Sequence, residues 1–542
     1  MGNNQTTMIR LKFDFFLSSL FISLIPSLCL AYEMGFNCGA ETVYTAQDGK
    51  RYEKDLPYSS VNGAGYVGGR IGKSPAQLKS GGTRDFDLYL QDRRGLSEYR
   101  FDVPNGSYIV KLHFSETEHH WRKLRTFDVQ IEDAKALADF DIFEKVRRNY
   151  VIDYRFATHV TDGQLNVKFV ASRGEPVLSA VYVFSRNPDT SPPAKPRSFS
   201  AMSGYKQAIL DWKDNPEDDI SGYNVYRSVG GEFRLLELTP SSSYIDNAVE
   251  VHQTYQYYIR PVDVYGNVGK RSEIQSATPL SPSDSELPVY ELSTDESHLI
   301  YLSQHVWDDV TIPVILRYQG VEYDNVRMRY RGGDARREAL KPSIKLIFSD
   351  NQLFRGKKKL NLQSDTWDSS LMRSKLAFDD YRRAGVLSPE AEWIHLRLND
   401  EFMGVYTAVD QIDERFLSLN GRDATGNIYK PFDFLVVLPD DADYSQLSEK
   451  ETNKGRADAD LREFVELINL TPQYLIREKL WEKLNLEEYL NWYCTNQLIS
   501  NWDIAGHNFL LYHDLKQDRW EIIAWDPDAA YVREDMPLDE GT

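Results

Sequence analysis

Three oxygen-bearing side chains near the end of the sequence have the types and the order that phosphoryl transfer requires. Asp503 and Asn508 lie five residues apart, and Asp526 follows two short apolar segments, 509–512 and 520–525. The polar stretch between these segments favours a turn, so we predict a β-hairpin that brings Asn508 and Asp526 to one edge. There, one carboxylate can orient an attacking hydroxyl, while an amide and a second carboxylate hold magnesium against nucleotide phosphates. Taken singly, each residue is better explained as a turn residue that contacts water, but their joint order predicts a site.

A lysine-bearing strand upstream can supply the positive charge that such a site needs. Residues 341–348 alternate as a strand, which places Lys341, Ser343 and Lys345 on one face. A lysine held on a strand above a cleft can neutralise nucleotide phosphates. Considered without the residues downstream, the segment is equally well explained as the solvated face of an edge strand.

Other elements of this region follow from its hydrophobic pattern. Residues 394–413 are typical of a pair of strands, and helical patterns occupy 459–469 and 475–499. The second helical pattern ends just before Asp503, so this helix is expected to position the loop that contains the candidate carboxylate.

A series of motifs runs through residues 287–531. They are Trp307-Asp308-Asp309, Tyr330-Arg331-Gly332, Lys341-x-Ser343, Lys359-Leu360-Asn361-Leu362, Ser370-Leu371-Met372-Arg373-x-Lys375-Leu376, Gly404-Val405-Tyr406, Ser500-Asn501-Trp502-Asp503, His507-Asn508-Phe509-x-Leu511-Tyr512 and Trp525-Asp526-x-Asp528. In these motifs and their order the region resembles the CotH family of spore-coat and secreted atypical protein kinases. The resemblance implies an α+β protein-kinase-like fold, with ATP and Mg²⁺ or Mn²⁺ as cofactors.

The resemblance also implies a role for each candidate residue. Asp503 is implied as the general base and Lys341 as the catalytic, phosphate-binding lysine. Lys345 and Arg331 are implied in nucleotide binding. The implied metal ligands are Asn508, Asp526 and Asp528. The family continues through further helices, whereas this sequence ends soon after Asp526, so the resemblance implies an incomplete C-terminal lobe.

The first part of the chain has the pattern of an all-β region. Between residues 33 and 186, segments such as 107–114 and 127–131 alternate between apolar and polar residues, as strands of a sandwich do. The region resembles the malectin family of carbohydrate-binding domains. The matching stretches are Phe36-Asn37-Cys38-Gly39, residues 99–108, Leu112-His113-Phe114-Ser115-Glu116 and Arg125-Thr126-Phe127-Asp128-Val129.

The malectin resemblance implies a ligand-facing loop near residue 118. The family's type member has adjacent tyrosine and phenylalanine there, whereas this chain has Glu118 and His119, followed by His120 and Trp121. Sugars commonly stack on an aromatic face while polar groups bind their hydroxyls. The candidate carbohydrate contacts are therefore Tyr66, His119 and Trp121. Adjacent histidines without further ligands are typical of a surface loop, and we assign them no metal.

A Pro-rich linker at 190–196 separates this region from a second all-β segment. Residues 197–278 carry about seven short strand patterns, with Trp212 on an early strand and Tyr255 where a tyrosine corner would lie. This segment resembles a fibronectin type III domain, which predicts spacing or docking rather than catalysis. A second linker follows at 278–285.

The composition is that of a folded, acidic protein. The chain has 542 residues, 41% of them hydrophobic, and a formal net charge of −19, which argues against nucleic acid or anionic membrane as the main partner. Basic residues followed by an apolar stretch predict a signal peptide at 1–31. The alternative, an uncleaved anchor helix, is disfavoured because Asp14 and Pro26 shorten the apolar run. After cleavage of the signal peptide the chain would keep Cys38 and Cys494. They lie in different predicted domains and imply no disulfide framework.

We therefore predict an exported multidomain protein with two all-β sandwiches and a kinase-like domain. The boundaries are 1–31 for the signal peptide, 32–188 for the malectin-like domain, 197–278 for the fibronectin type III domain and 287–542 for the CotH-like domain. The predicted activity is transfer of the ATP γ-phosphate to Ser or Thr of a protein substrate. The malectin-like domain is predicted to target this activity by binding a carbohydrate or cell-wall glycan. We expect a secreted or cell-surface location, without a membrane span after cleavage.

Two other classes of function stay open. One is a non-catalytic, carbohydrate-binding adhesin or scaffold with a pseudokinase domain. The other, a glycoside hydrolase, is weaker, because no two carboxylates stand in a recognisable catalytic pair.

Overall fold

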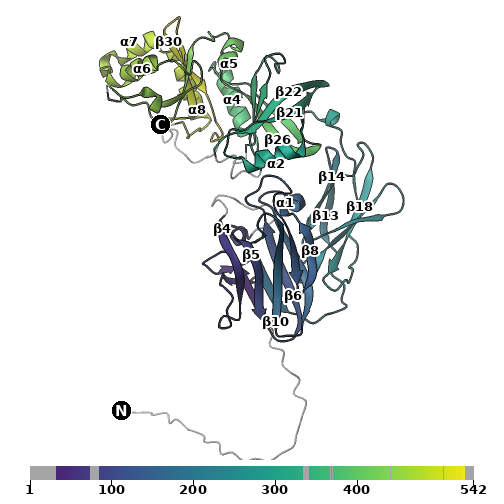
Figure 1. Cartoon of the computed structure of the whole chain (residues 1–542). Coiled ribbons are helices and arrows are strands. Elements are labelled where there is room, and N and C mark those ends of the chain that lie inside the picture. Colours follow the sequence, from purple (N-terminus) through teal and green to yellow (C-terminus); the bar gives the residue numbers. More distant parts are fainter. Residues whose placement is uncertain are drawn as a thin grey trace, which may run out of the picture.

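The computed structural model of this protein describes residues 32–73, 85–333, 341–365, 368, 370–439, 441–504 and 506–531. The predicted signal peptide at 1–31 lies outside these residues. The described chain forms two β-sandwiches, a closed β-barrel and a C-terminal sheet with helices, in that order. In Figure 1 the N-terminal sandwich lies below the barrel, and the C-terminal sheet lies beyond it. Among the described residues, no helix is long and apolar enough to cross a membrane.

The N-terminal sandwich packs two six-stranded sheets around one apolar core. Its elements are β1 (Glu33–Asn37), β2 (Tyr44–Thr45), β3 (Arg51–Lys54), β4 (Ala64–Lys73), β5 (Gln91–Asp102), β6 (Gly106–Ser115), β7 (Thr126–Ile131), β8 (Ala134–Phe140), α1 (Ile142–Val146), β9 (Val151–Val160), β10 (Gln164–Arg173), β11 (Val177–Leu178) and β12 (Ala180–Ser185). One sheet has the order β2-β3-β1-β12-β6-β9. The other has the order β11-β5-β10-β7-β8, with β4 paired to β5. The strands predicted at 107–114 and 127–131 are β6 and β7.

The second sandwich consists of a three-stranded sheet, β13-β14-β17, and a four-stranded sheet, β16-β15-β18-β19. Its strands are β13 (Arg197–Gly204), β14 (Gln207–Lys213), β15 (Ile220–Ser228), β16 (Arg234–Thr239), β17 (Ser243–Asp246), β18 (Tyr255–Asp263) and β19 (Gln275–Ala277). Trp212 lies in the core against Tyr223. The hydroxyl of Tyr255 accepts a 2.9 Å hydrogen bond from the backbone N–H of Glu250, which ties the start of β18 to the preceding loop.

The barrel is closed in the order β20-β21-β22-β23-β24-β26-β25. Its elements are β20 (Val289–Ser293), α2 (Glu296–Gln304), β21 (Ile312–Tyr318), β22 (Val321–Tyr330), β23 (Ile344–Phe348), β24 (Lys359–Gln363), α4 (Arg373–Arg383), β25 (Ala391–Leu398) and β26 (Glu401–Asp410). Ile344, Leu346 and Phe348 of β23 alternate into its core, so Lys345 faces outward. The strand pair predicted at 394–413 corresponds to β25 and β26.

The C-terminal sheet has the order β28-β27-β29-β30 and packs against helices. Its elements are α5 (Glu414–Leu419), β27 (Asn427–Pro431), β28 (Ser448–Lys450), α6 (Ala459–Leu470), α7 (Gln473–Lys483), α8 (Leu486–Leu498), β29 (Phe509–Asp514) and β30 (Arg519–Ala524). The helix predicted at 475–499 is two helices. The chain breaks at Asn485, whose side chain caps α8 and whose N–H donates to Trp520 O at 2.8 Å.

The sandwiches and the barrel are packed against one another. Trp121, Leu124 and Phe143 of the N-terminal sandwich belong to the same buried cluster as the barrel core. Tyr205 of the second sandwich lies 4.6 Å from the ring of His395 in β25. The prediction of a multidomain chain with N-terminal β domains is therefore confirmed.

Candidate functional site

The loop after α8 is held in place by a buried amide. Asn501 donates through Nδ2 to the Tyr381 hydroxyl at 3.2 Å and to Asn496 Oδ1 at 3.0 Å. Gly506 has φ +82°, and a Cβ there would lie 2.9 Å from Asp433 Oδ1. Glycine therefore both permits the left-handed backbone and allows the loop to pack against its neighbour.

The hairpin that follows places Asn508 and Asp526 at one edge. Phe509 of β29 pairs with Ala524 of β30, so Asn508 lies beside Trp525, and Asp526 is the next residue beyond this end of the hairpin. Asn508 has φ +62° and Asp526 has φ +49°, a left-handed conformation that Asn and Asp tolerate better than other non-glycine residues. At the opposite end, Asp514 closes the turn by accepting from the N–H of Lys516 at 2.9 Å.

Asp503 is fixed by two neighbours in the same loop. Asn508 Nδ2 donates to both the carbonyl oxygen and Oδ2 of Asp503 at 2.8 Å, and His507 Nε2 lies 3.1 Å from Asp503 Oδ1. The side chain of Asp503 is 32% exposed, so the carboxylate is oriented but remains accessible. The amide nitrogen of Asn508 is committed to Asp503, which leaves its amide oxygen as the atom that can bind a cation.

Further carboxylates surround this edge. Burial, and then the charges of Asp526, Asp365 and Asp503, raise the pKa of Asp528 to about 7. The structure therefore gathers Asp503, Asp526 and Asp528, three of the residues singled out in the sequence. Asp365 is an addition that the sequence argument did not name.

Lys341 lies in the segment that leads into β23 rather than on the strand. The strand begins at Ile344, because Pro342 lacks the N–H that a ladder requires. Lys341 Nζ donates to the carbonyl oxygen of Val405 and lies 4.4 Å from the ring centroid of Tyr406. Burial lowers the pKa of Lys341 to about 8, and the charge of Asp365 opposes that shift.

Asp365 is held firmly where it faces Lys341. Its carboxylate accepts from Ser374 Oγ at 2.8 Å and from Thr407 Oγ1. Burial raises the pKa of Asp365, although these hydrogen bonds and Lys341 act in the opposite direction. Because Asp365 influences both Lys341 and Asp528, it links the lysine of the barrel to the acidic edge of the hairpin.

Arg331 and Lys345 form a second cationic group on the barrel. The guanidinium of Arg331 lies 5.8 Å from the ring of Trp525, the residue before Asp526. Burial, and then Arg331 and Arg329, lower the pKa of Lys345 to about 7. Both predicted nucleotide-binding cations therefore lie on the side of the barrel that faces the C-terminal sheet.

Two amides on β24 were also missed by sequence reasoning. Asn361 pairs directly with Lys345 across the sheet, so the two share a face. Asn361 Oδ1 and Gln363 Oε1 are buried and find no hydrogen-bond partner among the described residues. The sequence did contain a signal for these amides. In Lys359-Leu360-Asn361-Leu362, strand alternation places Asn361 on the other face from Leu360 and Leu362, which lie in the core.

Comparisons with known proteins match two parts of the chain. Residues 328–538 match the family model described as CotH kinase protein, and residues 32–181 match the malectin domain model. The chain carries a malectin-like domain followed by a CotH domain.

Two curated relatives cover these domains. Inner spore coat protein H of Bacillus subtilis (strain 168) is 29% identical over 266 residues, which is 46% of this chain and 71% of that protein. Malectin-B of Xenopus laevis is 24% identical over 150 residues, which is 27% of this chain and 52% of that protein. Among solved structures, a β-glucuronidase of Bacteroides uniformis has a TM-score of 0.27 at 21% identity, and the match covers 29% of this chain and 18% of that one.

The donor set of the CotH domain suits a hard divalent cation. Asn508, Asp526 and Asp528 offer oxygen ligands, and the repulsion between the carboxylates of Asp526 and Asp528 is a cost that a cation would offset. The carboxylate oxygens of Asp503, Asp526 and Asp528 do not all lie within 4.8 Å of one another. Among the described residues, those of Asp189, Asp219 and Asp263 do. In this arrangement the carboxylates of Asp503, Asp526 and Asp528 cannot all be direct ligands of one Mg²⁺, so waters or phosphate oxygens would have to complete its shell.

The aspartates with the tighter spacing form a structural cluster. Arg186 lies 2.6 Å from Asp219 and 3.5 Å from Asp189, and Asn267 Nδ2 donates to Asp263 at 2.8 Å. An arginine and an amide therefore already stabilise these carboxylates, and we assign no metal to this cluster.

The three candidate carbohydrate contacts lie in different surroundings. The ring of Tyr66 is covered by the guanidinium of Arg93 at 3.3 Å and contacts Tyr99. The backbone N–H of His119 donates to Glu116 Oε1 at 3.0 Å. Trp121 is 2% exposed, against the CotH domain, and offers no open ring face to a sugar.

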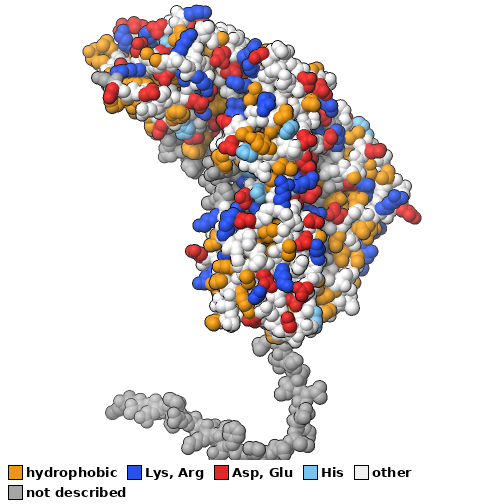
Figure 2. Space-filling view, viewed as in Figure 1, with side chains coloured by type: hydrophobic (Ala, Val, Ile, Leu, Met, Phe, Trp, Pro, Cys, Tyr) orange, Lys and Arg blue, Asp and Glu red, His pale blue; other side chains and the backbone are white. Residues whose placement is uncertain are grey.

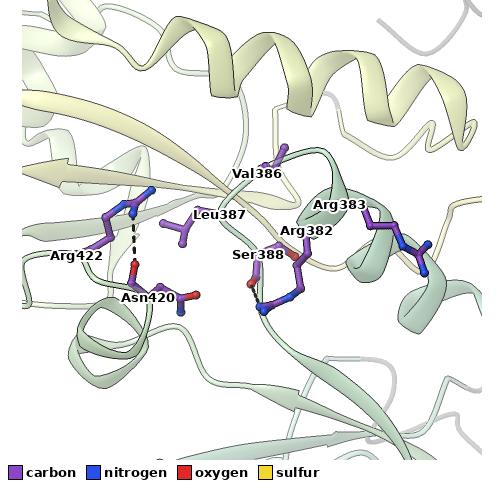
Figure 3. Close-up of a pocket in the computed structure, with 8 residues that line it drawn as sticks. Arg382, Arg383, Val386, Leu387, Ser388, Asn420 and Arg422 are labelled. Carbon is purple, nitrogen blue, oxygen red and sulfur yellow. Dashed lines mark hydrogen bonds between the residues drawn. The ribbon is translucent and has the colours of Figure 1, made fainter.

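A surface cavity of about 400 Å³ lies at the C-terminal end of α4, apart from the residues above. Figure 3 shows Arg382 directed toward Ser388 and Arg422 toward Asn420, while Arg383 points away. Arg422 also lies 2.6 Å from Glu521, and Arg382 lies 3.5 Å from Glu390. These guanidinium groups are engaged in local ion pairs, and none of the predicted site residues lines the cavity.

Proposed function

We propose that the CotH domain is an ATP-dependent protein kinase that phosphorylates Ser or Thr of a protein substrate. The observation that carries the proposal is the convergence of Asp503, Asn508 and Asp526 at one hairpin edge, with Arg331 of the barrel over the adjacent Trp525. The match to the CotH kinase protein family supports the same chemistry.

Each residue has a role that its surroundings support. Asp503, oriented by Asn508 and His507, would accept the proton of the attacking hydroxyl. Asn508, Asp526 and Asp528 would hold Mg²⁺ or Mn²⁺ through oxygen atoms. When bound, ATP and the metal supply the phosphoryl group and the positive charge that the acidic edge lacks.

The two half-buried lysines, Lys341 and Lys345, would respond to phosphate. Burial lowers the pKa of Lys341 to about 8, and burial together with Arg331 and Arg329 lowers that of Lys345 to about 7. Phosphate charge nearby favours the protonated ammonium, so nucleotide binding would be coupled to proton uptake by these lysines. Asp365 would keep Lys341 in place while the nucleotide is absent.

The rest of the chain would carry and target this domain. We propose the boundaries 32–188, 197–278 and 287–542, with the second sandwich as a fibronectin type III domain, and export directed by residues 1–31. The hydrogen bond from Glu250 to the Tyr255 hydroxyl supports the second assignment. The malectin match supports attachment to a carbohydrate or cell-wall glycan, and the spore-coat relative supports a surface location. Since Trp121 is buried, Tyr66 and His119 are the predicted contacts that retain exposed surface.

The deciding experiment measures transfer from radiolabelled ATP with magnesium or manganese. The protein without residues 1–31 should label itself or a generic Ser/Thr substrate, and Asp526→Ala should lose that label. Asp518→Ala is the matched control, because Asp518 lies at the turn of the same hairpin, where it pairs with Lys483. Equal label on the parent and Asp526→Ala would refute the assignment of the metal site.

The alternative is a carbohydrate-binding adhesin or scaffold with a catalytically silent CotH domain. It would be favoured if the parent protein bound glycan but transferred no label under any metal condition. Asp503→Ala should leave that binding unchanged, since Asp503 lies in the C-terminal loop and not in the malectin-like domain.

A further inference from the structure

The loop between β6 and β7, residues 116–125, is a rigid structure that we call the docking loop. Glu116 organises it, because its Oε1 accepts from the N–H of Glu118 at 2.9 Å and of His119 at 3.0 Å, while its Oε2 lies 2.8 Å from Arg125 Nε. The side chains of Glu116 and Arg125 are 2% and 3% exposed. A buried charge pair with several hydrogen bonds fixes one loop conformation and directs its tip away from the sandwich.

The tip of the docking loop packs into the CotH domain. Trp121 and Leu124, with Phe143 of α1, share a buried cluster with Leu299 and Leu302 of α2. Trp121 lies 6.1 Å from Phe143 between ring centroids. Contacts between domains of one chain are usually more polar than a core, so a continuous apolar cluster indicates a fixed rather than a mobile arrangement. Figure 1 shows α1 directly beneath α2.

Opposite charges surround this apolar contact. Arg122 lies 2.6 Å from Glu296 and 3.0 Å from Glu401, and Lys123 lies 2.8 Å from Glu296. Arg147 adds a 2.6 Å pair to Glu401. All the cations come from the malectin-like domain and both carboxylates from the barrel. Figure 2 shows charged side chains of both signs along this boundary.

The docking loop also reaches the residue next to Arg331. The ring of His120 lies 5.8 Å from that of Tyr330, the last residue of β22. The next N–H, that of Arg331, donates to Ser343 O at 3.0 Å, and the Arg331 guanidinium lies over Trp525. Tyr330 is itself buried. A short chain of contacts therefore runs from the loop through Tyr330 to the candidate site.

We propose that the docking loop is a positioning element of the CotH site: by packing on Tyr330 it fixes the end of β22 and thereby Arg331. The malectin-like domain is then an internal support of the site, and Trp121 and His120 act as positioning residues. The effect on nucleotide binding rests on the proposed kinase function, whereas the effect on the end of β22 does not. The partner that this surface fits is the α2 and β26 edge of the same chain.

The test compares variants of the full chain that disturb the interface from either side. Trp121→Ala removes the apolar anchor, and Glu401→Lys replaces a carboxylate that meets two arginines. Trp121→Phe keeps an aromatic ring at this position, so it should recover the behaviour that Trp121→Ala loses. Lys145→Ala is the matched control, because it removes an exposed pair with Glu237 of the second sandwich and leaves the docking loop intact.

Amide exchange and ATP kinetics are measured on each variant, and small-angle scattering shows whether the domains have separated. Amide hydrogen exchange at Tyr330 and Arg331 should accelerate in Trp121→Ala and Glu401→Lys. The KM for ATP should rise roughly five- to tenfold with a smaller change in kcat, as expected for a coupling transmitted to a binding residue. Trp121→Phe and Lys145→Ala should stay near the parent in both measurements.

Two outcomes would overturn the proposal. One is unchanged exchange at Tyr330 and Arg331 in both interface variants when small-angle scattering shows that the domains have separated. The other is accelerated exchange with an unchanged KM for ATP in an active parent. A parent that transfers no phosphate would count against the kinase proposal alone, because the exchange measurement still decides whether the loop holds β22.

Discussion

The docking loop and the candidate site around Asp503, Asp526 and Asp528 both hold buried or half-buried charged groups, but the pKa values of these groups are shifted in opposite directions. In the docking loop, each buried charge meets one of opposite sign. Burial alone would raise the pKa of Glu116, yet Arg125 and the hydrogen bonds to the carboxylate lower it to about 2. The charged form is therefore the stable one, as in an ion pair that maintains structure.

At the candidate site the shifts run the other way. The pKa of Asp528 is raised to about 7 by burial and by the neighbouring carboxylates, and burial lowers that of Lys341 to about 8. Both shifts disfavour the charged forms that prevail at neutral pH in water. Groups held in this unfavourable way are typical of functional sites, where a ligand relieves the cost. The direction of the pKa shift therefore distinguishes the Glu116–Arg125 pair from Asp528 and Lys341, although all of these groups are largely removed from water.

The sharpest contrast should come from Asp503. Asp503→Asn keeps the shape of the loop but removes the proton acceptor, so kcat should fall on the order of 10²- to 10⁴-fold. Because the residue adds to a cluster of like charges, the temperature of unfolding should stay the same or rise. Phosphoryl transfer and thermal unfolding of the same preparation measure both effects. A variant that lost stability while keeping kcat would place Asp503 with the structural charges.

Glu116 should show the reverse behaviour. Glu116→Gln leaves the buried Arg125 without its main partner, which should cost about 3 kcal/mol of stability. The midpoint of urea unfolding of the malectin-like domain measures this cost. Glu118→Gln is the control: Glu118 pairs with the same arginine but is 43% exposed, so its loss should cost less than about 1 kcal/mol. Equal costs for the two variants would contradict the distinction drawn from burial.

Local pattern was enough to predict the hairpin and the edge that it forms. Leu510 and Tyr512 alternate into the same core as Ile523, so the strands and their turn could be predicted without tertiary information. Once the hairpin exists, Asn508 and Asp526 must share an edge. The prediction that the strand includes Lys341 was wrong for a local reason. Pro342 cannot join the ladder, and the strand starts at Ile344, two residues after this proline.

Other features depend on contacts that no local pattern contains. Asp365 becomes a partner of Lys341 only because barrel closure brings Thr407 of β26, and α4 brings Ser374, to the end of β24. Trp121 illustrates the same limit. A tryptophan on a polar loop has the same sequence signal whether it stacks on a sugar or packs against another domain. The structure buries it against α2, and a relation between distant domains decides its role.

Acid should weaken the docking contact through His120, the smallest effect that we expect. Burial, and then the charge of Arg148, lower the pKa of His120 well below its usual value of 6.5, with Glu116 opposing and His119 adding to the shift. The docked ring is therefore neutral, and separation lets it take up a proton. Docking is at full strength above about pH 6.5 and weakens as the pH falls below that, by at most about 1.4 kcal/mol per pH unit.

Small-angle scattering at neutral pH and at about pH 5 measures this effect as an increase in the radius of gyration. His120→Gln should remove the pH dependence, whereas His252→Gln should keep it, since His252 is an exposed residue of the second sandwich. If acid opened the parent and His120→Gln equally, protonation of His120 would not be the cause, and the role given to its neutral ring would be wrong.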